Sequence, residues 1–491
     1  MKYIVAIDQS TSATKSMLFD EKLNLVARAS VEHKQYYPQP GWVEHDAEEI
    51  LHNTYKSVEL LLQKSKITPN EVSSVAITNQ RETVVVWDKF TGKPIYNAVV
   101  WQCNRGAKIC EDLIAQGHEQ KVLEKTGLII NPYFPASGVQ WILDNVKNAR
   151  QAAYEGRLIL GTIDTWLIWN LTSKKIHATD HTNASRTLLF NINTLDWDDE
   201  LLELFTIPRS MMPEVLPCDA HYGTTNMSGL LPEVPIAGVL GDSHGALVGQ
   251  MCFSPGMGKA TYGTGSSIAI NIGEKVQLPP RGLVTSVAFS SLGKVFYEYE
   301  GNIHCTGGTI KWLQDNLMLI QSAEETEEIA NSVESTDGVY FVPAFAGLGA
   351  PWWNHNAKAL ICGMNRGTTK AHIVRAALES IAYQIKDLIT LIQESGIEIT
   401  EIRVDGGPTR NKFLMQFQAD MLQRKINVSP IEEASALGAV IMNGFALRRW
   451  TKFEDVTSLR KGNEYIVPKM SIEKVESLYN GWKKAIQRTI L

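Results

Sequence analysis

Two short loops in this sequence carry residue types that suit the binding of an anion. The stretch "YIVAIDQSTSATKSMLFD" (3–20) places Asp8 near the end of an apolar strand pattern and follows it with small hydroxyl and amide side chains. The stretch "ATYGTGSS" (260–267) repeats this order, with glycines beside the hydroxyls. Small residues let backbone N–H groups approach an anion closely, and hydroxyls add donors without bulk. One such loop alone fits an ordinary hairpin turn, but two of them predict a site for a polyphosphate.

A third glycine-bearing segment, "VDGGPTRN" (404–411), follows another apolar strand pattern. We expect a nucleotide base and its α-phosphate to lie against this glycine pair. The sequence contains neither G-x-x-x-x-G-K-[ST] nor G-x-G-x-x-G after a strand, so we expect neither a P-loop nor a dinucleotide-binding site.

Charged residues beside apolar strands are the candidates for the remaining chemistry. In "VLGDSHGALVGQ", Asp242 stands where a strand ends and a helix of small residues begins. A carboxylate there could accept a proton from a hydroxyl nucleophile, or it could cap the helix. In "TNQRETVVVWD", Arg81 and Glu82 interrupt a buried pattern. They form either a structural salt bridge at a strand end or a donor and acceptor for a polyhydroxylated ligand. We expect His244 to be packed or exposed and not to bind a metal.

These candidates need two similar α/β units to position them. Alternation predicts strands over 3–8, 15–20 and 25–31, and helical periodicity follows within 45–65. The second half repeats the strand, small loop and strand order, and later shows a long amphipathic helix within 371–396. We therefore predict two domains, 1–251 with the first small loop, Arg81, Glu82 and Asp242, and 252–491 with the second small loop and the segment 404–411.

Composition narrows the class of protein. The chain has 491 residues, 44% hydrophobic composition and a net charge of −6, which is typical of a globular protein with more than one core. A near-neutral charge without long basic blocks disfavours nucleic acid as a partner. No apolar run is long enough for membrane insertion, and the N-terminus has a strand pattern and not a signal peptide. We expect a cytoplasmic protein with reduced cysteines.

Longer segments identify a family. "TNQRETVVVWD", "PYFPASGVQWILDN", "TNASRTLLFNINTLDWDD", "TYGTGSS" and "VPAFAGLGAPWW" resemble the FGGY carbohydrate kinases, and within them the glycerol kinases, from about residue 2 to about residue 485. The resemblance implies two ribonuclease-H-like domains of the actin and Hsp70 type, with ATP and a polyol meeting in the cleft between them. It implies phosphoryl transfer from MgATP to a terminal hydroxyl of a small polyol, most simply glycerol. We also expect a homo-oligomer.

The resemblance also assigns roles to residues. Asp242 would be the catalytic base, and Asp8 would help to place Mg²⁺. The residues implied at the polyol are Arg81, Glu82, Trp101, Tyr133, Asp242, Ser243 and Ser267. The residues implied at the nucleotide are Thr11, Ser12, Ala13, Lys15, Thr264, Gly307, Lys311, Gly407 and Asn411.

Departures from the family pattern leave the substrate open. Ser243 replaces a usual glutamine and Ser267 a usual phenylalanine, so we expect a larger and more polar pocket. Lys15 replaces an arginine, and Lys311 a glutamine. The segment 228–235 lacks the glycine and arginine residues that would bind fructose bisphosphate in the family. A four- or five-carbon polyol or ketose, such as erythritol, xylitol or xylulose, is the alternative substrate, and a non-catalytic actin/Hsp70-type nucleotide sensor is the alternative class.

Overall fold

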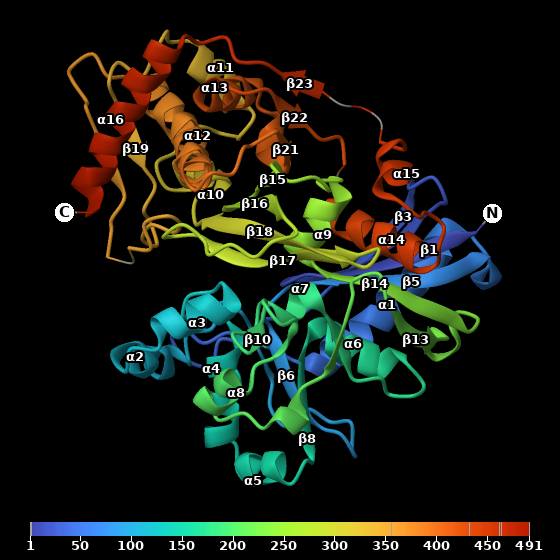
Figure 1. Ribbon diagram of the computed structural model, residues 1–491. Coiled ribbons are helices and arrows are strands. Elements are labelled where there is room, and N and C mark those ends of the chain that lie inside the picture. Colours follow the sequence, from blue (N-terminus) through green and yellow to red (C-terminus); the bar gives the residue numbers. More distant parts are fainter. Residues whose placement is uncertain (1, 355, 432, 461, 463, 491) are drawn as a thin grey trace.

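Two large twisted sheets organise the molecule (Figure 1). The computed structural model describes residues 2–354, 356–431, 433–460, 462 and 464–490. The first sheet has the strand order β13 (His221–Thr225), β14 (Val234–Gly241), β5 (Val72–Asn79), β1 (Tyr3–Gln9), β2 (Ala13–Phe19) and β3 (Leu25–Glu32). The second has the order β17 (Val284–Ser291), β18 (Lys294–Ile303), β16 (Ser266–Gly273), β15 (Met257–Tyr262), β21 (Glu401–Asp405), β22 (Ile426–Val428) and β23 (Glu464–Ile466).

The two sheets share one pattern of pairing. In the first, β1 pairs antiparallel with β2 and parallel with β5, and β5 pairs parallel with β14. In the second, β15 pairs antiparallel with β16 and parallel with β21, and β21 pairs parallel with β22. The predicted repetition of the strand, small loop and strand unit is therefore confirmed. Both small loops join the first two strands of their sheets.

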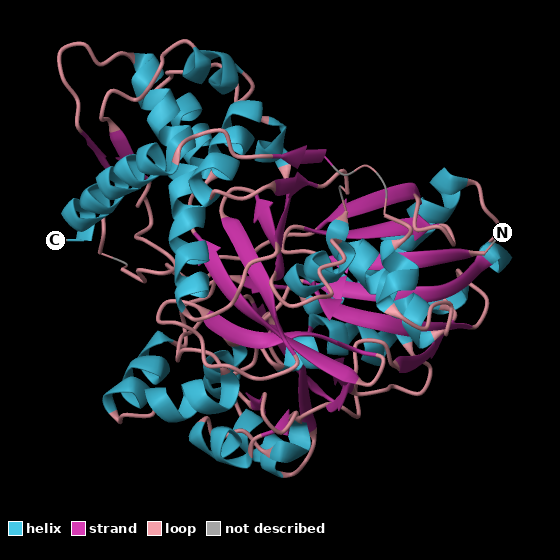
Figure 2. Cartoon of the chain, turned by 45° about the horizontal axis from the view of Figure 1, so that its top comes forward, coloured by secondary structure: helices cyan, strands magenta, loops and turns pink. Residues whose placement is uncertain are grey.

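Helices cover these sheets on both faces (Figure 2). Those of the first half are α1 (Ala47–Ser65), α2 (Ala107–Ala115), α3 (Glu119–Thr126), α4 (Pro135–Asn145), α5 (Ala149–Tyr154), α6 (Ile163–Leu171), α7 (His181–Ala184), α8 (Asp199–Leu204) and α9 (Asp242–Gly249). Those of the second half are α10 (Gly307–Asp315), α11 (Glu325–Asn331), α12 (Lys370–Glu394), α13 (Lys412–Leu422), α14 (Ala434–Ala446), α15 (Phe453–Thr457) and α16 (Ile472–Ile490). Helix α1 begins where predicted, because the Asp46 carboxylate accepts from the backbone N–H groups of Glu48 and Glu49.

Smaller sheets complete the first half and the outer part of the second. A four-stranded sheet has the order β4 (Glu44–His45), β7 (Ala98–Val99), β6 (Val84–Asp88) and β8 (Leu158–Thr162). Two-stranded pairs are β9 (Ala178–Asp180) with β12 (Glu214–Leu216), β10 (Phe190–Asn191) with β11 (Asp196–Trp197), and β19 (Tyr340–Val342) with β20 (Leu360–Cys362).

The alternation of β1 explains how the first sheet joins the second. Val5 and Ile7 belong to an apolar cluster with α1 and α6, whereas Ile4 and Ala6 belong to a cluster with α9, α14 and residues of β16 and β17. Helix α14 comes from the second half of the chain but packs on β1, β5 and β14 of the first sheet, and Figure 1 shows it beside β1. The chain thus returns to its first sheet after building the second. The exact boundary between residues 251 and 252 stays a prediction.

Candidate active site

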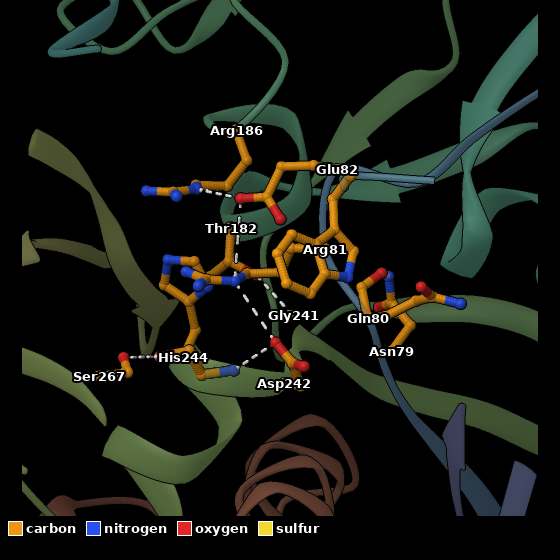
Figure 3. A network of polar contacts seen from close by, with 12 residues as sticks. Asn79, Gln80, Arg81, Glu82, Thr182, Arg186, Gly241, Asp242, His244 and Ser267 are labelled. Carbon is orange, nitrogen blue, oxygen red and sulfur yellow. Dashed lines mark hydrogen bonds and ion pairs between the residues drawn. The ribbon is translucent and has the colours of Figure 1, made fainter. Parts of the chain in front are cut away.

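Asp242 is presented at the junction of a strand and a helix. Strand β14 ends at Gly241 and α9 begins at Asp242, as the sequence indicated. The Asp242 side chain is 40% exposed. Its Oδ1 accepts from the backbone N–H of Ser243 at 2.7 Å and lies 3.3 Å from Nε of Arg81 (Figure 3). An accessible carboxylate held by two donors can accept a proton from a hydroxyl that approaches its free side.

Arg81 and Glu82 each form an ion pair with a residue far away in the sequence. Two terminal nitrogens of Arg81 donate to Glu300, with distances of 3.1 and 2.6 Å. Nε of Arg186 donates to Oε1 of Glu82 at 2.6 Å, and its Nη1 lies 2.8 Å from Oε2 of Glu300. Arg81 and Glu82 therefore both take part in salt bridges, with Glu300 and Arg186 as their principal partners. Whether they also bind a polyhydroxylated ligand stays a prediction.

Burial and charge oppose each other in this network. Burial alone would lower the pKa of Arg81, but the neighbouring carboxylates, Glu300 first, raise it well above its ordinary value. Burial would likewise raise the pKa of Glu300, but Arg186 and Arg81 hold it well below the usual range. The pKa of Glu82 is raised, because burial outweighs its two arginines. The network therefore keeps fixed charges beside Asp242 although almost no water reaches them.

A pocket beside this network gathers three of the predicted polyol residues. Glu82, Trp101 and Tyr133 line it together with Arg105 and Phe134. The rings of Trp101 and Tyr133 meet edge to face at 5.5 Å. Burial, reinforced by Glu82, raises the pKa of Tyr133, so its hydroxyl keeps its proton near neutral pH. A carboxylate, a phenol and an indole therefore come together around one small enclosed space. That a polyol contacts them stays a prediction.

The indole of Trp101 also reaches the small loop between β1 and β2. Its Nε1 donates to Oγ1 of Thr11 at 3.1 Å. The backbone carbonyl of Thr11 lies 2.8 Å from Nε2 of His33, and the backbone N–H of His33 donates to the carbonyl of Ser12. Ala13 is the first residue of β2 and is buried. This loop therefore lies directly against the wall of the pocket that Glu82, Trp101 and Tyr133 line.

Asp8 and Lys15 face each other at the base of the first loop. They are paired in register between β1 and β2, and Nζ of Lys15 lies 3.3 Å from Oε2 of Glu433. Burial raises the pKa of Asp8 to about 7, Lys15 opposes this shift, and Asp242 and Glu433 add to it. A carboxyl group with a pKa of about 7 is partly protonated at neutral pH, and a bound cation would favour its ionised form.

The second loop is closed onto the start of α10. The backbone N–H groups of Thr306 and Gly308 donate to the carbonyl of Thr264, and the N–H of Gly307 donates to the carbonyl of Gly263. A Cβ on Gly307 would lie 2.6 Å from that carbonyl oxygen, so only glycine allows this approach. The side chain of Thr264 is exposed.

Gly406 and Gly407, in the segment 404–411, have different surroundings. Gly406 has φ +100°, and a Cβ there would lie 1.9 Å from the carbonyl oxygen of Tyr262. Gly407 is exposed, and a Cβ there would meet no atom within 4 Å. Gly406 therefore serves the packing of β21 on β15, whereas Gly407 leaves space on the outside. Asn411 caps α13 through its Oδ1, which accepts from Leu414 N–H, and its Nδ2 donates to Thr326.

Divalent magnesium fits the carboxylates at the first loop. The Asp242 carboxylate is close enough to raise the pKa of Asp8. Mg²⁺ is usually bound by one or two carboxylates and keeps waters and substrate phosphates as its other ligands. Within the described residues, no three His, Cys, Asp or Glu side chains gather as a cation site. A role of Asp8 in placing magnesium therefore stays a prediction.

Comparison with known proteins decides the family. Residues 3–249 match the N-terminal domain of the FGGY family of carbohydrate kinases, and residues 258–447 match its C-terminal domain. The chain belongs to the FGGY family of carbohydrate kinases.

Full-length relatives of this FGGY kinase are glycerol kinases. It is 48% identical over 491 residues to glycerol kinase 2 of Thermotoga maritima, covering 100% of this chain and 99% of the relative. It is 49% identical over 490 residues to glycerol kinase of Caldanaerobacter subterraneus subsp. tengcongensis, with the same coverage. A crystal structure of Plasmodium falciparum glycerol kinase with ADP superposes with a TM-score of 0.95 at 39% identity, covering 100% and 99% of the two chains. A ligand-bound xylulose kinase from Lactobacillus acidophilus shares the fold, with a TM-score of 0.90 at 21% identity over 100% and 99%. The two-domain fold of the actin and Hsp70 type is thereby confirmed.

Most predicted site residues of this FGGY kinase gather around the loops and the network. Ser243 and Ser267 meet, with their hydroxyl oxygens 3.2 Å apart. Lys311 is different, because its side chain is 76% exposed and its ammonium pairs with Asp315 one turn later in α10. The roles assigned to individual residues stay predictions.

Sequence reasoning missed three buried charged residues of this FGGY kinase, namely Glu300, Arg186 and Lys259. Glu300 lies in "VFYEYEGN", where Glu298 and Glu300 alternate with aromatic residues in a strand pattern. Two acidic residues that are two positions apart in a strand lie on the same face of the sheet. If the strand is buried, their charges need partners of opposite charge. That signal could have indicated Glu300, but nothing in the sequence names Arg81 as its partner.

No helix in the described part of the chain is both long and apolar enough to span a bilayer.

Proposed function

We propose that this FGGY kinase transfers the γ-phosphoryl group of ATP to a terminal hydroxyl of glycerol and forms glycerol 3-phosphate. The observation that carries the proposal is the accessible Asp242 carboxylate, held beside Arg81 and close to the pocket of Glu82, Trp101 and Tyr133. The full-length similarity to glycerol kinases supports the same substrate.

In the proposed mechanism, the polyol lies with its carbons against Trp101 and its hydroxyls on Arg81, Glu82 and Tyr133. Asp242 accepts the proton of the terminal hydroxyl as its oxygen attacks the phosphorus. Catalysis rests mainly on positioning and on stabilisation of charge, as is general for phosphoryl transfer.

The phosphates would lie between the first loop and the second, where Thr11, Ser12 and Thr264 offer hydroxyls or backbone N–H groups. The base would lie beside Gly407. Magnesium, held by Asp8 and the phosphates, would neutralise charge on the transferring group. We also propose a cytoplasmic homo-oligomer.

A substrate comparison tests the proposal. Consumption of ATP is measured with glycerol, tetritols, pentitols and pentuloses, and kcat/KM is compared across the series. The proposal predicts the highest kcat/KM for glycerol. A longer polyol or a pentulose with the highest value would replace glycerol as substrate, and nucleotide binding without phosphate transfer to any of them would indicate a sensor protein.

A further inference from the structure

Glu300 is the meeting point of the buried network. It lies on β18 of the second sheet and is 1% exposed. Its Oε2 accepts from Arg81 at 3.1 Å and lies 2.8 Å from Nη1 of Arg186. Its Oε1 accepts from Arg81 at 2.6 Å and is reached by Ser243 at 3.3 Å and by Ser267 at 3.4 Å. One carboxylate thus contacts the arginine beside Asp242 and both serines.

The hydrogen bonds around the two serines have a fixed direction. An ionised carboxylate accepts hydrogen bonds and cannot donate them. Each serine hydroxyl therefore donates either to Glu300 or to the other serine, which then donates to Glu300. On the other side, Nζ of Lys259 lies 3.2 Å from Oγ of Ser267 and donates to it. Lys259 is only 2% exposed, and burial lowers its pKa against the pull of Asp405 and Glu300. The serine protons are therefore directed at Glu300. When both serines donate directly to Glu300, Ser243 keeps its lone pairs and Ser267 keeps the one that Lys259 does not occupy.

We propose that Glu300 is a positioning residue that orients Arg81 beside Asp242 and turns Ser243 and Ser267 into hydrogen-bond acceptors toward the substrate. The inference rests on the proposed function, because it concerns the part of the polyol that faces the serines. A substrate alcohol there can donate to a serine oxygen. A carbonyl oxygen at the same carbon can only accept a hydrogen bond. It would face the lone pairs of the serine oxygens and would have no donor there.

Matched pairs of substrates test whether the serine oxygens accept hydrogen bonds from a substrate alcohol. The pairs are glycerol with dihydroxyacetone, erythritol with erythrulose, and xylitol with xylulose, which differ by an alcohol or a carbonyl at one carbon. We expect the alcohol of at least one pair to exceed its ketone in kcat/KM by about tenfold or more, the size of an unmatched buried acceptor. Calorimetric dissociation constants for the same pairs give the ratio independently of turnover.

Glu300→Gln should reverse the direction of the hydrogen bonds between residue 300 and the two serines. Because Oε2 faces two guanidinium groups and Oε1 faces one, the amide oxygen should take the place of Oε2. The amide nitrogen should then face the serines and lose the hydrogen bond that Oε1 accepts from Nη2 of Arg81. The amide then donates to the serine oxygens, and the serine protons become free to meet a carbonyl. We expect the ratio of alcohol to ketone to fall about tenfold or more, with the affinity for ADP unchanged. Glu300→Asp keeps the charge and should keep the preference for the alcohol.

Glu298→Gln is the matched control, because Glu298 lies two residues earlier on β18 and contacts His244 and not Arg81. It should leave the ratio unchanged. If Glu300→Gln does not fold, Ser267→Ala decides, since losing one acceptor should lower the ratio.

Equal use and equal binding of alcohols and ketones by the unmodified protein would overturn the inference, as would a folded Glu300→Gln or Ser267→Ala variant with an unchanged ratio. Binding with the expected ratio but without phosphate transfer would instead refute only the proposed function.

Discussion

Nε of Arg81 lies 3.3 Å from Oδ1 of Asp242, while the two terminal nitrogens of the same guanidinium donate to Glu300 on the other sheet. The proposed base is therefore oriented by a cation that is itself anchored across the two halves of the molecule. A buried cation held by several acids keeps its position without help from solvent. The following outcomes are expected from this arrangement.

Asp242→Asn should lower kcat by about two or more orders of magnitude, because the amide cannot accept the proton of the attacking hydroxyl. The affinity for ADP, measured by calorimetry, should stay within a few-fold of the unmodified protein. Asp112→Asn, at an exposed acid on α2, is the control. Turnover near the unmodified rate in Asp242→Asn would exclude this residue as the base.

The stability of the metal-free protein should depend on Asp8. Its pKa is about 7 in the folded protein and 3.8 in its ordinary state, so between these values the folded chain binds the extra proton. Stability contributed by this proton is present below about pH 4 and is lost as pH rises through about 7. Denaturant titrations from pH 4 to pH 8 should therefore show a smaller decline in Asp8→Asn than in the unmodified protein.

Magnesium adds a second readout at the same residue. Because the metal binds the ionised carboxylate, binding should tighten as pH rises from 6 to 8 and should release a proton. Asp8→Asn should weaken magnesium binding and remove this pH dependence. A pH-independent affinity in the unmodified protein would contradict the assignment of Asp8.

Gly406 and Gly407 form a matched pair of tests. Gly406→Ala should destabilise the protein by about 1 kcal/mol or more, because φ is positive and the new Cβ would meet the carbonyl of Tyr262. Gly407→Ala meets no protein atom, so its melting temperature should stay close to that of the unmodified protein while KM for ATP rises. A Gly407→Ala variant with unchanged KM would place the nucleotide elsewhere.

The buried pair of His244 and Glu298 should contribute to stability and not to chemistry. Nε2 of His244 lies 3.1 Å from Oε1 of Glu298, and both side chains are 0% exposed. Glu298→Ala should lower the free energy of unfolding by about 1 to 3 kcal/mol, because it leaves a buried donor without its main acceptor. The double change to His244→Leu and Glu298→Ala should recover part of that loss, measured by urea denaturation. An additive double variant would show that the pair does not interact energetically.

Local patterns in the sequence determined the two small loops, the position of Asp242 at the start of a helix, and the repetition of one α/β unit. These features depend on neighbours within a few residues, such as the apolar alternation of β1 and the small residues that follow it. The same holds for Asp46, which caps α1 two and three residues onward. Sequence reasoning reaches such features because strand and helix periodicity is expressed along the chain itself.

The tertiary structure alone decided which charges meet. Arg81 and Glu300 are 219 residues apart, and Lys15 and Glu433 are 418 apart. Arg81 and Glu82 are adjacent, yet they turn to different partners, and Lys311 turns outward although it lies near a predicted nucleotide loop. A buried ion must find an opposite charge or remain unsolvated, and that choice is made by the packing of two sheets around α9 and α14 and not by proximity in sequence.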